Sequence, residues 1–140
     1  MKQVFAIFFT LSVAFSMNSC SMVKGLDNPL ELLTNNQWVL STLLGNVIGE
    51  SDFAQQLPFL NFGDDGSING STGCNNFNGQ FNLSGTSLSL DPGAMTKKAC
   101  PGEGESNFLS ALNSVKNFKI DGNTLKLLDG AKEVMSFIKK

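Results

Sequence analysis

Short apolar runs separated by Gly, Asn, Asp and Pro dominate the chain between residues 37 and 100. Runs of this length, bounded by turn residues, are typical of antiparallel strands. Asp64, Asp65 and Gly66 predict a hairpin turn, because Gly accepts a positive φ and Asp tolerates it. The spacing predicts six strands here, at residues 37–44, 57–62, 67–71, 78–83, 87–90 and 94–99.

One later segment has a helical period instead. Phe108, Leu112 and Val115 recur at spacings of four and three residues, which predicts an amphipathic helix within 103–117. Asn28 and Pro29 also predict a short helical turn, with Asn28 as its N-cap. Three more strands are expected, at 118–120, 125–128 and 134–138. The pattern therefore predicts a mainly β (α+β) fold, with a small curved antiparallel sheet or barrel and one packed helix.

The composition excludes several kinds of chemistry. The 140 residues include no His and no Tyr, and all ten basic residues are Lys. The chain therefore lacks the commonest general base and the guanidinium fork that grips phosphate. A formal net charge of −2, with no basic run longer than two residues, predicts no nucleic-acid partner.

Charged residues are unevenly distributed along the chain. Residues 25–96 contain seven acidic residues and no Lys, whereas residues 97–140 contain eight Lys and five acidic residues. Asp64 and Asp65 lack the spacing of a calcium-binding loop, so no metal site is expected. Glu103 and Glu105 are interpreted as acids that favour the start of a helix rather than as a catalytic pair. We expect no enzyme activity and no cofactor.

The N-terminus has the parts of an export signal. Lys2 precedes an apolar stretch of 12 residues at 4–15, which is shorter than the roughly 20 residues that span a bilayer. Ser19 and Cys20 follow, and here the chain resembles a bacterial lipoprotein precursor, in which the Cys after a small residue is lipidated. Cleavage near Ser19 by an ordinary signal peptidase, leaving Cys20 as a free thiol, is the alternative.

The lipoprotein resemblance implies three regions and a location. Residues 1–19 would be a signal peptide, 20–32 a lipidated Cys with its tether, and 33–140 the folded domain. The lipid on Cys20 would anchor the protein to a bacterial membrane in the cell envelope, facing the periplasm or the cell surface. Lipidation of Cys20 would also leave Cys74 and Cys100 as a pair, which an oxidising compartment would join in a disulfide. A redox or nucleophilic site, with Lys97 and Lys98 nearby to stabilise a thiolate, is the alternative.

Two sequence elements carry a more specific resemblance. Residues 73–79 match the form G-C-N-x-F-x-G, and residues 96–100 match T-x-x-A-C. With Trp38 and the later apolar runs, they make the chain similar to the META domain family of HslJ-like lipoproteins, over about residues 33–139. The resemblance implies a β-rich envelope protein with no known reaction. The motif residues are Gly73, Cys74, Asn75, Phe77, Gly79, Thr96 and Cys100.

The motif can also be interpreted from its residue types. Asn75, Asn76 and Asn78 can hydrogen-bond nearby backbone groups, and Phe77 can enter the core, which favours a folded corner over a binding loop. The functional hypothesis is a monomeric, non-catalytic envelope lipoprotein that binds an unidentified envelope protein or acts like a chaperone under envelope stress. The alternative is a carrier that holds a small apolar ligand or lipid in a cleft between helix and sheet. That cleft would be lined by Trp38, Phe108 and Leu112.

Overall fold

A computed structural model describes residues 28–140. The predicted signal peptide and Cys20 lie outside these residues. The helices are α1 (Pro29–Leu33), the 3-10 turn η1 (Glu50–Asp52) and α2 (Gly104–Asn113). The strands are β1 (Gln37–Leu43), β2 (Asn46–Val47), β3 (Phe59–Phe62), β4 (Ser67–Ser71), β5 (Asn76–Ser84), β6 (Ser87–Met95), β7 (Asn117–Asp121), β8 (Thr124–Asp129) and β9 (Lys132–Lys139).

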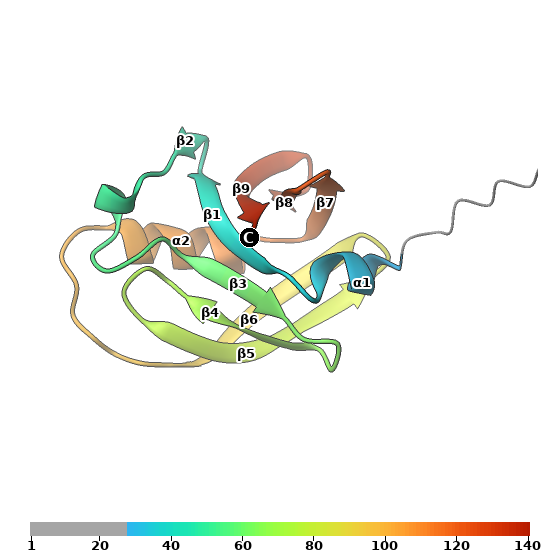
Figure 1. Ribbon diagram of the computed structural model, residues 1–140, viewed down its shortest axis with the longest axis horizontal. Helices are drawn as coiled ribbons and strands as arrows, with labels where there is room; N and C mark the ends of the chain where they lie inside the picture. The colour runs from blue at the N-terminus through green and yellow to red at the C-terminus, as the bar shows by residue number, and fades with distance from the viewer. Residues whose placement is uncertain (1–27) are drawn as a thin grey trace, which may run out of the picture.

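The strands form one curved antiparallel sheet in the order β2-β1-β3-β4-β5-β6-β7-β8-β9 (Figure 1). β1 also pairs with β9, which closes the sheet into a barrel. The pairing between β6 and β7 is the shortest in the barrel, with Ser87 and Asn117 as its one pair of residues. α2 contacts β1, β6 and β9. The predicted fold class, a mainly β barrel-like sheet with one packed helix, is confirmed.

Alternating side chains of the strands build the core inside the barrel. Trp38 on β1, Phe108 on α2 and Phe137 on β9 are fully buried, and the Phe108 and Phe137 rings meet edge to face at 6.5 Å. The indole Nε1 of Trp38 donates to the backbone oxygen of Leu33 at 2.9 Å, which fixes the end of α1 against the core. Among residues 28–140 no helix is long and apolar enough to cross a bilayer.

Local sequence signals gave most element positions correctly. Asn28 is the N-cap of α1, since its Oδ1 accepts a hydrogen bond from the backbone N–H of Leu30 at 3.1 Å. β4 has the predicted bounds, Ser67–Ser71. α2 lies within the predicted helical segment but ends at Asn113, where the backbone N–H groups of Ser114 and Val115 bond to the backbone oxygens of Ala111 and Leu112, three residues back instead of four.

The predicted strand at 87–90 is present, but its separation from a second strand at 94–99 is wrong. They are one strand, β6, which runs through Asp91, Pro92 and Gly93. A register shift opposite Phe77 and Asn78 and the positive φ of Gly93 (59°) form a bulge that accommodates these residues. Residues 96–99 are not a strand, because β6 ends at Met95. The spacing also missed β2 and η1, which are only two and three residues long.

Candidate functional site

The G-C-N-x-F-x-G motif begins in the turn between β4 and β5, and its last four residues, 76–79, are the first residues of β5. The backbone N–H of Thr72 donates to the backbone oxygen of Asn75 at 2.8 Å, which closes the turn. Gly73 has a φ of 90° and lies against the ring of Phe53, so a side chain at this position would be strained and would overlap that ring. Gly79, further along β5, lies so close to the backbone of Asp91 that a Cβ would overlap it. The fold therefore leaves no room for a side chain at either position.

The cysteines of the two motifs are joined. Cys74 and Cys100 form a disulfide with their Cα atoms 6.1 Å apart, as the cysteine count predicted. Cys74 is in the β4–β5 turn, and Cys100 is in the strap, which we define as residues 96–103 between β6 and α2. The disulfide therefore fastens the strap to the turn.

Asn75 is the centre of a hydrogen-bond network beside the disulfide, and its side chain is buried with 3% exposure. Its Oδ1 accepts from the hydroxyl of Thr96 at 2.9 Å and from the backbone N–H of Lys98 at 2.7 Å. Its Nδ2 donates to the backbone oxygen of Lys98 at 3.1 Å and to Glu105 Oε1 at 2.8 Å. One amide therefore holds both the strap and the first turn of α2.

Glu105 completes this network from the helix side. The hydroxyl of Thr72 donates to Glu105 Oε1 at 2.6 Å, so the carboxylate bonds to both ends of the β4–β5 turn. The sequence prediction placed Glu105 at the start of a helix, which is correct, but it missed this second role. The available signal was the Asn that follows Gly73 and Cys74 in a tight turn. If such an Asn is buried, its amide needs hydrogen-bond partners from other segments.

The other motif residues support the same corner. Phe77 is buried in the core. Asn76 and Asn78 are exposed on β5, and among residues 28–140 their side chains make no hydrogen bonds, so only Asn75 of the three acts as predicted. We define the motif corner as Thr72, Gly73, Cys74, Asn75, Thr96, Lys98, Cys100 and Glu105. Its polar groups are hydrogen-bonded to one another and its two sulfurs are joined.

The proposed apolar cleft lies in the core. Trp38, Phe108 and Leu112 are at most 1% exposed, and their side chains fill the space between α2 and the sheet. None of them lines the surface hollows described here. The hypothesis treated a row of large apolar residues as a ligand site, whereas the fold uses these residues for its own packing.

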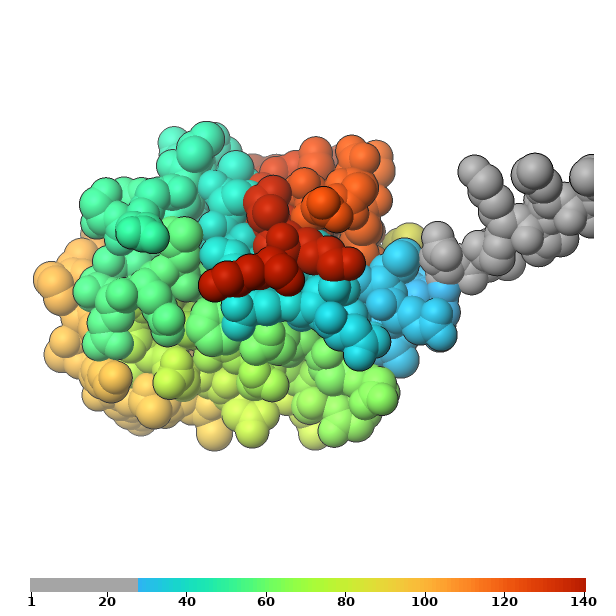
Figure 2. Space-filling view, viewed as in Figure 1, coloured from blue at the N-terminus to red at the C-terminus, as the bar shows by residue number. Residues whose placement is uncertain are grey.

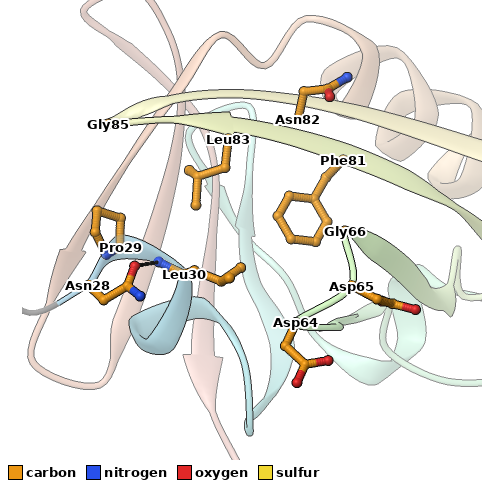
Figure 3. A pocket seen from close by; sticks show the side chains of 10 residues that line it. All are labelled: Asn28, Pro29, Leu30, Asp64, Asp65, Gly66, Phe81, Asn82, Leu83 and Gly85. Atoms are coloured by element: carbon orange, nitrogen blue, oxygen red, sulfur yellow. Dashed lines mark hydrogen bonds between the residues drawn. The ribbon is translucent and has the colours of Figure 1, made fainter.

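A hollow of about 500 Å³ lies at one end of the barrel, between α1 and the β3–β4 and β5–β6 turns. Leu30, Phe81 and Leu83 point towards one another there, and Asn82 points away (Figure 3). The Ser67 hydroxyl and then its backbone N–H bond to Asp65, at 2.6 and 3.0 Å, and lower the pKa of that carboxyl. Within residues 28–140 there is no group of three His, Cys, Asp or Glu that could hold a metal ion.

A smaller hollow of about 290 Å³ lies beside the β1–β2 hairpin. Val47, the last residue of β2, is 85% exposed. Leu44, in the turn between β1 and β2, is 46% exposed and has a φ of 51°. Ile48 and Asp52 also line the hollow. Two exposed apolar side chains next to a hollow give this end of the molecule an apolar surface with an acidic border.

The fold and the motif corner define this chain as a small closed β-barrel protein with one disulfide-fastened corner. The META domain family model matches residues 31–140, so the chain belongs to the META domain family. The predicted family resemblance is confirmed. Comparison with curated proteins gives no match.

Three solved structures are similar to this chain, each with a TM-score of 0.62 over 79% of it. One, solved by NMR, is 26% identical, with 94% of that chain covered. A protein from Burkholderia xenovorans, also solved by NMR, is 22% identical with 86% covered. A DUF4847 family protein from Bacteroides vulgatus is 16% identical with 96% covered. The last two likenesses show the fold alone.

Proposed function

We propose that this chain is a non-catalytic, lipid-anchored module of the cell envelope that binds another envelope protein through its β1–β2 hairpin. The observation that carries the binding surface is the exposure of Val47 beside Leu44 and the neighbouring hollow. Exposed apolar residues rimmed by polar ones are characteristic of protein-binding surfaces. The non-catalytic part is supported by the motif corner, whose polar groups are engaged in holding the fold.

The charge around the hairpin specifies the chemistry of the partner. Glu50 and Asp52 follow the hairpin directly, and residues 28–96 contain six acidic residues and no Lys. A complementary partner presents an apolar side chain next to Lys or Arg. Such a partner would place the apolar group against Val47 and the cation towards Asp52.

The lipid anchor suits this arrangement. Cys20 is eight residues before Asn28, where the described chain begins. Figure 1 shows α1 at the right of the folded domain, where the chain enters it, and the β1–β2 hairpin at its upper left. An anchor at Cys20 would hold the α1 end near the membrane and leave the hairpin pointing away from it.

The family resemblance to HslJ-like lipoproteins supports a role in envelope stress. The ligand-carrier alternative is not favoured, because its lining residues are core residues.

Photo-crosslinking in the native host tests both parts of this proposal. A photoreactive phenylalanine analogue is placed at Val47, and the control carries it at Thr86, an exposed turn residue near α1. We expect position 47 to give an adduct of one defined mass in the membrane fraction, and position 86 not to give it. The same position-47 chain with Cys20→Ala should move to the soluble fraction.

Two results would contradict the proposal separately. Equal adducts at both positions, or no adduct at position 47, would exclude the hairpin as the binding surface. Continued sedimentation of the Cys20→Ala chain with membranes would exclude the lipid anchor at Cys20.

A further inference from the structure

The outer face of β1 and β3 carries a groove of about 400 Å³. Its floor is apolar: Val39 and Phe59 are paired neighbours on the two strands, and Leu57 lies just before β3. All three are partly exposed. The polar side chains that line the groove are Gln37, Glu50, Gln55, Gln56 and Lys140.

Three of these five polar side chains are glutamine amides. Gln56 is held in place, because its Nε2 donates to the hydroxyl of Ser71 at 3.1 Å, which leaves its Oε1 as an acceptor. Gln37 is positioned by the end of β9, since its backbone oxygen accepts from the N–H of Lys140 at 2.9 Å. Figure 2 shows this side of the molecule, where the C-terminal residues lie over β1. The groove is therefore an apolar floor beside three amides that can both donate and accept hydrogen bonds, with one carboxylate and one ammonium group.

A row of amides continues from the groove across the sheet. Gln37 pairs with Asn61, Asn61 with Asn69, and Asn69 with Asn78, so the four side chains share the outer face of β1, β3, β4 and β5. The spacing of neighbouring strands makes this row about 14 Å long. Asn61 Nδ2 donates to Asn69 Oδ1 at 3.0 Å, which orients two of the amides. We call these four residues the amide row.

The chemistry of the row selects a neutral ligand rich in hydroxyl groups. An amide donates and accepts, as a hydroxyl does, whereas a carboxylate only accepts and an ammonium only donates. All four members of the row are uncharged, and the groove adds one acid and one Lys, Glu50 and Lys140. An anionic polymer would need several cations.

We propose that the groove and the amide row form a binding site for a neutral saccharide chain. One sugar ring lies with its C–H face on Phe59 and Val39, and its hydroxyls bond to Gln37, Gln55 and Gln56. The following rings lie along the amide row. The residues that would contact the sugar lie on β1, β3 and the segment before β3, not on the hairpin residues Leu44 and Val47, so this site extends the proposed function and does not depend on it.

NMR titration tests the site with two neutral probes, a β-1,4-linked glucose hexamer and an N-acetylglucosamine hexamer. The protein is the exported chain with Cys20→Ser, labelled with ¹⁵N. We expect at least one hexamer to shift the backbone amide signals of residues 37, 59 and 69, with a Kd of about 1 mM or lower. Phe59→Ala should weaken binding about tenfold, and Asn69→Ala about threefold to tenfold, as expected for one lost hydrogen bond.

Asn113→Ala is the matched control, because Asn113 is an exposed amide on α2, away from the amide row. It should leave the affinity unchanged. Asn69 is exposed, so Asn69→Ala keeps the test valid if Phe59→Ala weakens the fold. The proposal is wrong if neither hexamer shifts these signals, if the shifts cluster elsewhere, or if Asn69→Ala binds as the control does. It is also wrong if a neutral hexapeptide shifts the same signals with equal affinity.

Discussion

Replacing Asn75 with alanine is expected to lower the free energy of unfolding by about 3 kcal/mol. The substitution removes the amide that bonds to Thr96, Lys98 and Glu105. A typical hydrogen bond contributes about 1 kcal/mol net, and the partners left in this partly buried corner lose more because they cannot all reach water. Urea unfolding followed by circular dichroism measures the change.

The neighbouring residue provides the control. Asn76 is also an asparagine of the motif region, but its side chain is exposed. Asn76→Ala should therefore change the free energy of unfolding by less than about 0.5 kcal/mol. Equal effects of the two substitutions would show that Asn75 is not the centre of the motif corner.

Removal of the disulfide should have an effect of similar size. Cys74 and Cys100 are 26 residues apart in sequence, and closing a loop of this length lowers the entropy of the unfolded chain. The chain-entropy model gives a stabilisation of about 3 to 4 kcal/mol. The double variant Cys74→Ala with Cys100→Ala is expected to lose this amount in urea unfolding.

A reductant serves as an independent check on the disulfide. It should destabilise the parent protein by a similar amount and leave the double variant unchanged. Alkylation of the unfolded parent should modify neither Cys74 nor Cys100 without reductant, and both after reduction. Free thiols at these positions in freshly isolated protein would contradict the disulfide.

The sequence predicted the parts of the fold that depend on local patterns. Turn residues such as Asp64-Asp65-Gly66 located β4, a short apolar run located β8, and Asn28 with Pro29 located α1, because turns and caps are specified by neighbouring residues. β6 was divided wrongly, because Asp91-Pro92-Gly93 has the composition of a turn. Its pairing with β5 is long-range and includes a bulge that no local pattern shows.

Of the site, the sequence predicted only the disulfide, which followed from the number of cysteines. Three cysteines, with one assigned to the lipid, gave the Cys74–Cys100 pair. The bond between Asn75 and Glu105 joins residues 30 positions apart, and a sequence pattern does not specify such a contact. Trp38 and Phe108 were taken for a cleft because large apolar residues line both cores and ligand sites, and only the packing distinguishes them.

The central claim is that the family motif serves the fold, with Asn75 and Glu105 acting together at the motif corner. A double-mutant cycle with Asn75→Ala and Glu105→Ala tests it most directly. The two side chains are 2.8 Å apart, so their joint removal should cost less than the sum of the single losses, by at least about 1 kcal/mol. Losses that add within about 0.3 kcal/mol would mean that the two residues act independently, and the claim would be wrong.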